Sequence, residues 1–414
     1  MSFEWIPFTE LLSAIVDNRG KTCPVGDSGT PLIATNCISN NSLYPAYDKA
    51  RFVDKETYKT WFRGHPRPGD ILFVCKGSPG RTNWVPDPVD FCIAQDMVAV
   101  RADPEKVYPK YLFAALRSSI VLTQIDNMHV GTMIPHFKKG DFHKLNIPIP
   151  SQAQQTFIGD YYFTISERIT LLRETNATLE VIAQALFKSW FVDFDPVRAK
   201  AEGLEPQTMG ATTAALFPDS FEESELGLVP KGWRVGKVED VMDLPYGKAL
   251  KSTDRIDGVV PVYGSGGITG YHNESLVDGP SIIVGRKGTV GSLYWEDRAF
   301  FPIDTVFYVK AKQPLTYCYY LLKTLGLEGM NTDGAVPGLS RNNAYRLQVT
   351  VPSVPALQAF DEIVSVVREK IFASSQQAET LTQLRDTLLP RLISGQLRLP
   401  EAEMVVQSTL SEAS

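Results

Sequence analysis

The segment PSQAQQTFIGDYYFTISERITLLRETNATLEVIAQALFKSWFVDF, from Pro150 to Phe194, decides the fold of this chain. It recurs as PSVPALQAFDEIVSVVREKIFASSQQAETLTQLRDTLLPRLISGQL, which begins at Pro352, 202 residues later (352 − 150). Both copies open with the helix-start signal Pro-Ser and carry apolar residues three and four positions apart, the pattern of a long amphipathic helix. Because neither helix can bury its apolar face alone, we expect the two helices to pair with each other.

Shorter matches on both sides extend this repeat to almost the whole chain. The run DILFVCKG matches PSIIVGRKG, FCIAQDMVAVRA matches FFPIDTVFYVKA with Asp96 on Asp304, and Trp5 matches Trp233. The first copy is longer, and most of its extra residues lie between Thr22 and Pro68. The predicted fold class is therefore α+β, with two similar mixed α/β domains and two long helices in an internal repeat.

The repeat sets the expected domain boundaries. The first domain includes strands near 70–77 and 92–102 and a helix over 109–126. Pro390 removes a hydrogen-bond donor, so a kink or break is expected in the second long helix near Leu389, with its end at Gly395. The expected parts are a first domain (1–149), a first long helix (150–194), a linker with one helical turn (195–230), a second domain (231–351), a second long helix (352–397) and a polar C-terminal tail (398–414).

Composition narrows the class of protein. The formal net charge of −6 excludes a uniformly basic nucleic-acid-binding surface and leaves room for a local basic face. No apolar run is long enough for a membrane span, and no signal peptide is expected. The five cysteines are scattered without a CxxC pair, which indicates buried thiols in a reducing cytoplasm and argues against zinc or disulfides. We therefore expect a cytoplasmic protein without a membrane partner.

No pattern in the chain indicates catalysis. GSGGITG (264–270) lacks the strand, helix and acidic residue of a dinucleotide fingerprint, and GRKGTVG (285–291) lacks the ending of a phosphate-binding P-loop. The five histidines form no HxxxH pair, and no tetrapeptide typical of amino methylation occurs. We expect no catalytic residue, no metal and no cofactor in this chain.

Basic and amide side chains recur on glycine-rich turns in both copies. Arg and Lys can pair with guanine, Asn can pair with adenine, and glycine turns let a backbone approach phosphate. A solvated surface charge explains any single one of these residues equally well, and the recurrence at aligned loops favours DNA. The candidate DNA-binding residues are Lys76, Arg81, His136, Lys138 and Lys139 in the first copy, and Arg286, Lys287, Arg341, Asn342 and Asn343 in the second.

A second group of candidates lies at the ends of the long helices. Trp190, Phe191 and Phe194 cluster at the end of the first helix, and Ile393 lies at the end of the second. Large apolar residues of this kind either fill a core or form a docking patch. We expect Trp190 to lie in a core and Phe191, Phe194 and Ile393 to contact a partner protein.

Several segments resemble the specificity subunit of type I restriction-modification systems. These segments are LFKSWFVDFDPVRAKAEG (Leu186–Gly203), LVPKGWRVGKVEDV, VYGSGGITGY, VGRKGTVG, FPIDTVFYV, AVPGLSRN and LLPRLISGQL (Leu388–Leu397). The resemblance implies a non-catalytic reader of double-stranded DNA, in which each of two target-recognition domains reads one half of an asymmetric site. It also implies that the two helices form an antiparallel coiled coil that separates the domains.

The same resemblance implies partners. Methyltransferase subunits, which carry S-adenosylmethionine, would dock on the chain, and restriction/translocase subunits, which use ATP, would join for cleavage. A helix over 154–190 would be roughly 55 Å long, enough to span half-sites roughly 34–36 Å apart. The alternative is an oligomerising scaffold whose paired helices bind only protein, and binding to random versus host DNA distinguishes the two.

Overall fold

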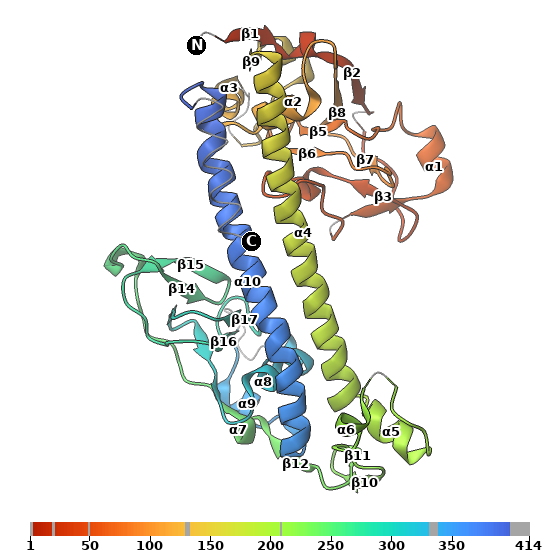
Figure 1. The fold of residues 1–414 in the computed structure, drawn as a ribbon, viewed down its shortest axis with the longest axis vertical. Coiled ribbons are helices and arrows are strands. Elements are labelled where there is room, and N and C mark those ends of the chain that lie inside the picture. Colours follow the sequence, from red (N-terminus) through yellow and green to blue (C-terminus); the bar gives the residue numbers. More distant parts are fainter. Residues whose placement is uncertain are drawn as a thin grey trace. The chain divides into compact units, whose positions relative to one another are not determined.

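The computed structural model describes residues 3–18, 21–48, 50–128, 133–207, 209–330 and 338–397, so the predicted tail lies outside the described residues. The chain divides into unit 1, Met1–Glu174 with Ser374–Ser414, and unit 2, Thr175–Ala373. Both boundaries fall inside the two long helices, α4 (Gln152–Phe191) and α10 (Val354–Ile393) (Figure 1). Each unit therefore contains one mixed domain together with a part of each long helix.

The two long helices confirm the predicted repeat. Each has 40 residues, and α10 begins and ends 202 residues after α4 (354 − 152 and 393 − 191). In unit 2 they run antiparallel, because Asn176 donates to the Ile371 carbonyl at 3.2 Å while Phe187, further along α4, packs against Phe360, 5.7 Å between ring centroids. In unit 1 the hydroxyl of Tyr161 donates to the Leu384 carbonyl at 3.4 Å.

Of the kink or break predicted near Leu389, the break is wrong, because α10 continues through Pro390 to Ile393. Pro390 lies in the last helical turn, where its missing N–H removes one hydrogen bond and its fixed φ suits a helix. The carbonyl of Pro390 still accepts from the Ser394 amide at 2.9 Å, and Gly395 follows with φ of 72°. The helix therefore ends at the predicted glycine and not at the proline.

Unit 1 is built on an antiparallel four-stranded sheet in the order β2–β8–β5–β6, and β3 lies between β4 and β7 in a second sheet. Helices α2 and α3 pack with the long helices in one core that includes Phe113, Tyr162 and Leu381. The elements are β1 (Glu4–Pro7), η1 (Phe8–Leu11), β2 (Leu12–Asp17), β3 (Thr30–Ile33), η2 (Thr35–Cys37), β4 (Arg51–Val53), α1 (Lys55–Thr60), β5 (Ile71–Val74), β6 (Thr82–Trp84), β7 (Cys92–Ile93), β8 (Met97–Ala102), α2 (Pro109–Leu116), α3 (Ser119–Met128), η3 (Lys139–Lys144) and β9 (Asn146–Ile149).

Unit 2 repeats this plan: β16 lies between β17 and β19, and β14 lies between β15 and β18. Its core includes Phe187, Trp190 and Phe360 of the long helices, so the expectation of a buried Trp190 is confirmed. The elements are β12 (Arg234–Lys237), α7 (Val238–Val241), β13 (Met242–Asp243), η4 (Ser252–Asp254), β14 (Val260–Gly264), β15 (Gly267–His272), β16 (Ser281–Gly285), β17 (Leu293–Glu296), β18 (Phe301–Pro302), β19 (Val306–Tyr308), β20 (Lys310–Ala311), α8 (Leu315–Thr324), η5 (Leu327–Gly329), α9 (Arg341–Tyr345) and β21 (Gln348–Val351).

Backbone hydrogen bonds correct two of the predicted matches between the copies. The Asp96 carbonyl accepts from the Cys75 amide at 2.9 Å, and the Thr305 carbonyl accepts from the Arg286 amide at 2.9 Å, so Asp96 corresponds to Thr305 and not to Asp304. Trp5 lies opposite Pro148 in the β1–β9 pair, as Val235 lies opposite Thr350 in the β12–β21 pair. Trp5 therefore corresponds to Val235, and the match to Trp233 was wrong by two residues.

The helix predicted over 109–126 is two helices, α2 and α3, which are interrupted at Arg117. Arg117 is only 7% exposed and donates to the Ser42 carbonyl at 2.7 Å, the Asn40 carbonyl at 3.2 Å and the Thr82 hydroxyl at 3.1 Å. Its guanidinium also lies over the ring of Phe113, 4.3 Å from the centroid. The chain turns at Arg117 because this side chain ties α2 to the loop before β4.

The predicted linker contains more structure than the single helical turn expected from its sequence. It consists of α5 (Asp195–Ala201), α6 (Ala211–Ala214) and an antiparallel hairpin of β10 (Phe221–Ser224) and β11 (Gly227–Pro230). Lys200 holds the segment together by donating to the Phe217 carbonyl at 2.5 Å and the Ala214 carbonyl at 3.3 Å. Among the helices that the structure describes, none combines the length and hydrophobicity needed to cross a bilayer.

Candidate nucleic-acid interface

Two loops from distant parts of the sequence meet in unit 2. One follows β16 and contains Arg286 and Lys287, and the other, 338–343, leads into α9. The Leu339 amide donates to the Arg286 carbonyl at 2.8 Å, and Lys287 and Gly338 form an isolated β-bridge. Gly288 makes the first loop possible, because its φ of 85° lies in the left-handed region that favours glycine. We call these two segments the paired loops of unit 2.

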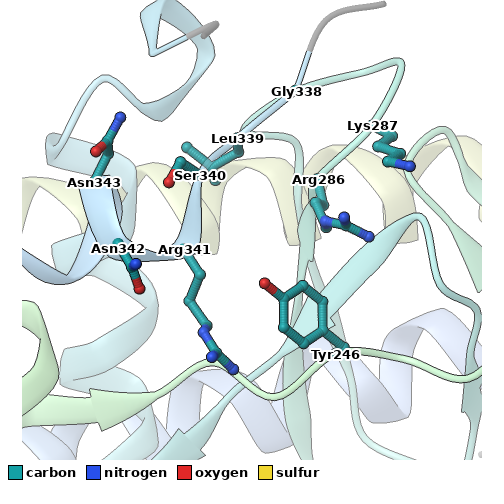
Figure 2. A pocket seen from close by; sticks show the side chains of 9 residues that line it. All are labelled: Tyr246, Arg286, Lys287, Gly338, Leu339, Ser340, Arg341, Asn342 and Asn343. Atoms are coloured by element: carbon teal, nitrogen blue, oxygen red, sulfur yellow. The ribbon is translucent and has the colours of Figure 1, made fainter. Parts of the chain in front are cut away.

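Tyr246 lies between two arginines of the paired loops. The guanidinium carbon of Arg286 is 4.8 Å from the centroid of the Tyr246 ring, and that of Arg341 is 4.7 Å from it. Figure 2 shows both arginine side chains extending toward this ring from different segments. Arg286 also donates to the Asp304 carbonyl at 2.8 Å. Cation–π contacts therefore hold the two guanidinium groups in place over a partly exposed ring.

The paired loops and Tyr246 enclose an open pocket of about 460 Å³. It is lined by Tyr246, Arg286, Lys287, Gly338, Leu339, Ser340, Arg341, Asn342 and Asn343 (Figure 2). Three of these side chains are cationic, two are amides, and no acidic side chain of the described residues lines the pocket. Such a set can donate bidentate hydrogen bonds to base edges and single bonds to phosphate oxygens. No group of three or more potential metal ligands occurs among the described residues.

Unit 1 brings the equivalent loops together in the same way. Lys76 forms an isolated β-bridge with His136, the Phe137 amide donates to the Cys75 carbonyl at 2.9 Å, and the Gly77 amide donates to the Pro135 carbonyl at 2.9 Å. Phe137 is buried, as Leu339 is in unit 2. The paired loops of unit 1 are therefore residues 76–77 and 135–139, and the repeat predicted from sequence extends to the bridge between them.

The side chains around the two sets of paired loops differ in chemistry. Asp17 lies opposite Val98 on β8, as Tyr246 lies opposite Phe307, so Asp17 and Tyr246 hold equivalent positions. Lys139, the equivalent of Arg341, forms an ion pair with Asp17. In unit 1 an acidic residue thus neutralises the basic side chain, whereas in unit 2 an aromatic ring leaves the charge of its counterpart intact.

The other arginine of the unit 2 pocket, Arg286, also has no basic counterpart in unit 1. Cys75 holds the position of Arg286, since each residue directly precedes the lysine of the β-bridge. Burial, together with the charges of Asp17 and Asp96, raises the pKa of the Cys75 thiol to about 12. This thiol is therefore neutral at physiological pH and contributes no charge. Each set of paired loops carries three basic side chains, and Asp17 neutralises one of the three in unit 1.

The structure gathers most of the ten candidate DNA-binding residues into these two places. All five candidates of the second copy line the unit 2 pocket. Lys76, His136, Lys138 and Lys139 lie on the paired loops of unit 1, and Lys138 is exposed. Arg81 lies outside these loops and donates to the Thr35 carbonyl at 3.0 Å, a contact within the fold of unit 1. Sequence reasoning missed Tyr246 and Asp17, because a single aromatic or acidic residue carries no recognisable pattern.

The proposed partner-contacting residues are mostly buried, which corrects that expectation. Phe191 is 7% exposed and Ile393 is 1% exposed, and each lies in the core of its own unit. Phe194 is half-buried and packs against Trp233 and Phe221, with 5.9 and 6.2 Å between ring centroids. Like most large apolar residues, these side chains pack into a core, because the hairpin and the neighbouring helices cover them.

Comparisons with known proteins agree on one family. The family model described as type I restriction modification DNA specificity domain matches residues 19–181 and 230–378. The chain is 26% identical over 404 residues to the type I restriction enzyme HindI specificity subunit of Haemophilus influenzae, covering 80% of this chain and 86% of that protein. It is 23% identical to the MjaIX specificity subunit of Methanocaldococcus jannaschii, covering 71% of this chain and 70% of that protein.

The fold is also similar to a solved structure. The crystal structure of the S subunit of a type I restriction-modification system from M. genitalium superimposes with a TM-score of 0.61 at 20% identity. The match covers 94% of this chain and 96% of that one. At this identity the likeness concerns the fold alone, and it supports the arrangement of two similar mixed domains with long helices.

Proposed function

The chain belongs to the type I restriction modification DNA specificity family, as its sequence predicted, and we propose that it reads a two-part DNA site, one part with each unit. The observation that carries this proposal is the same bridge between the same two loops in both units, Lys76 with His136 and Lys287 with Gly338. The side chains around the two bridges differ, so the two half-sites should differ in sequence. The site would then be asymmetric.

The partners and cofactors follow from the same proposal. Methyltransferase subunits would dock on the chain and bring S-adenosylmethionine, and restriction/translocase subunits would bring ATP, in a cytoplasmic complex in which this chain is not catalytic. Support for docking comes from exposed apolar side chains on the long helices within unit 2. Val181 and Ile182 of α4 are 64% and 52% exposed, and Val366 of α10 is 64% exposed. Apolar residues on an exposed helix surface often mark a protein interface.

A methylation map of the host genome with and without the gene tests the proposal. Deletion should remove methylation at one split motif and leave other motifs methylated. The chain purified with its methyltransferase subunit should then prefer a duplex that carries this motif over a random-sequence duplex. Binding without sequence preference, together with intact assembly, would favour the alternative of a scaffold that binds only protein.

The long helices should set the distance between the half-sites. Each helix of 40 residues is about 60 Å long at 1.5 Å per residue, more than one turn of DNA. We expect that four residues inserted after Glu174 and four after Ala373 lengthen the non-specific spacer and leave both half-sites unchanged. The added length is about 6 Å, which is about two base pairs at roughly 3.4 Å each. The motif methylated in cells by the variant reports the spacer.

The insertion needs a control of equal length outside the helices. Four residues placed between Glu225 and Leu226, in the turn of the β10–β11 hairpin, should leave the spacer unchanged. Insertion into both helices keeps their apolar faces in register, which insertion into one helix would not. A changed half-site with an unchanged spacer would show that the helices do not set the distance.

A further inference from the structure

The connection between β4 and β5 of unit 1 differs in charge from its counterpart in unit 2. It comprises residues 54–70 and carries four exposed basic side chains, Lys55, Lys59, Arg63 and Arg67. Its acidic residues are Asp54 and Glu56, which are exposed, and Asp70, which is buried against Arg101 at 2.8 Å. The equivalent connection between β15 and β16, residues 273–280, contains Glu274 and Asp278 and no Lys or Arg. We call residues 54–70 the basic connection.

Local contacts hold the basic connection in a fixed conformation. The carboxylate of Asp54 accepts from the Thr57 amide at 2.7 Å and caps α1. The rings of Tyr58 and His65 stack with 4.0 Å between centroids, and a ring nitrogen of His65 contacts the Tyr58 carbonyl at 3.0 Å. Charges on an ordered segment lose little conformational entropy when they bind, so the connection can contribute affinity.

The basic connection borders the paired loops of unit 1. The Arg63 amide donates to the side-chain carbonyl of Asn18 at 3.3 Å, and Asn18 directly follows Asp17, the ion-pair partner of Lys139. Figure 1 shows α1 at the outer edge of unit 1. Within the described residues the four basic side chains form no ion pair with a carboxylate, so their charges are available to an external anion.

We infer that the basic connection binds the phosphate backbone of the DNA next to the half-site that unit 1 reads. This inference rests on the proposed function and adds a second, sequence-independent contact to it. Of the three basic side chains on the paired loops of unit 1, Lys139 is neutralised by Asp17, so an additional source of positive charge on this unit would add to its affinity for DNA. Exposed Lys and Arg side chains that no ring orients can neutralise phosphates, a contact that does not depend on the base sequence.

The test replaces all four basic residues by glutamine (Lys55→Gln, Lys59→Gln, Arg63→Gln and Arg67→Gln) in the full chain assembled with its methyltransferase subunit. Binding is measured against salt on a duplex with the methylated motif and on a random-sequence duplex. The slope of log affinity against log salt should become shallower by about 0.9 for each phosphate that the variant no longer neutralises. Both duplexes should bind roughly tenfold more weakly or worse, with the ratio between them unchanged.

Two controls separate phosphate binding from a general loss of charge or fold. Glu56→Gln, on the same helix, should slightly strengthen binding to both duplexes, and Lys106→Gln, at an exposed position outside the connection, should leave the salt slope unchanged. Equal thermal unfolding of the variants and the wild type excludes misfolding. An unchanged salt slope in the fourfold variant overturns the inference.

Two other experimental outcomes differ from an unchanged salt slope and have different meanings. A fourfold variant that folds as the wild type and yet fails to assemble with the methyltransferase subunit would assign the connection to a protein partner and also overturn the inference. A wild-type complex that shows no preference for the motif duplex would instead overturn the proposed function. The variant and the wild type therefore test the two proposals separately.

Discussion

Replacing Arg286 and Arg341 together by glutamine is expected to weaken binding to the specific DNA site by roughly 100-fold, since one bidentate contact to a base contributes about 1–3 kcal/mol. Both guanidinium groups lie within 5 Å of the Tyr246 ring, at 4.8 and 4.7 Å, so their donor edges are positioned before DNA arrives. The substitution by glutamine removes both the positive charge of arginine and its planar set of hydrogen-bond donors. Competition binding with the motif duplex and a random-sequence duplex measures the effect.

The change should act on specificity and not only on affinity. If the arginines read bases, sequence preference in the unit 2 half-site falls and the unit 1 half-site is unaffected. The paired substitutions Arg286→Lys and Arg341→Lys keep the positive charge but lack the planar guanidinium that donates two parallel hydrogen bonds. This lysine variant should therefore be little more specific than the glutamine variant. Full rescue by lysine would mean that the two arginines contact phosphates alone.

A matched control removes the same charge elsewhere in unit 2. Lys237 and Lys312 are exposed and pair with Glu239 and Asp243, outside the pocket. Their replacement by glutamine should change affinity far less than the arginine variant, and an equal loss would contradict the assignment of the pocket. Tyr246→Phe should bind as the wild type, whereas Tyr246→Ala should weaken binding, because it removes the ring that orients both guanidinium groups.

Replacing Arg117 by methionine is expected to destabilise unit 1 by about 3 kcal/mol, because the buried Thr82 carbonyl and three partly buried carbonyls lose their donor. Arg117 donates to the Ser39, Asn40 and Ser42 carbonyls at 3.4, 3.2 and 2.7 Å. Burial lowers the pKa of its guanidinium from the usual value, while the nearby Tyr162 hydroxyl raises it. Methionine fills similar space and provides no donor. Denaturant unfolding measures the loss, and hydrogen exchange of residues 39–43 locates it.

The repeat provides a matched control at Lys323. The hydroxyls of Tyr111 and Tyr317 donate to the equivalent carbonyls of Pro148 and Thr350, and Arg117 and Lys323 each follow six residues after these tyrosines. Lys323 forms an ion pair with Glu180, and Glu180 keeps a second partner, Arg368, at 3.1 Å. Because these side chains are partly exposed and the acid stays paired, Lys323→Met should cost about 1 kcal/mol. Equal losses at both positions would show that the hydrogen bonds of Arg117 to the loop are not what stabilises unit 1.

Features read from local periodicity were predicted well from sequence. The long helices begin and end within a few residues of expectation, and both contain 40 residues. Pro390 and Arg117 were misjudged for related reasons. The cost of a proline depends on how close the helix end lies, and the interruption at Arg117 depends on acceptors 35 to 78 residues away in the sequence. Neither is visible in a local window.

The amino-acid sequence by itself determined that this protein has two copies of one plan and two long helices, because repeated segments and helical periodicity can be read directly along the chain. The resemblance of several segments to a known family indicated DNA specificity. The sequence also named the basic loops. Only the tertiary structure decided which of those residues meet and what surrounds them. Tyr246 orients two arginines in unit 2 and Asp17 neutralises Lys139 in unit 1, because strand pairing brings together residues about 100 positions apart (341 − 246 = 95 and 139 − 17 = 122).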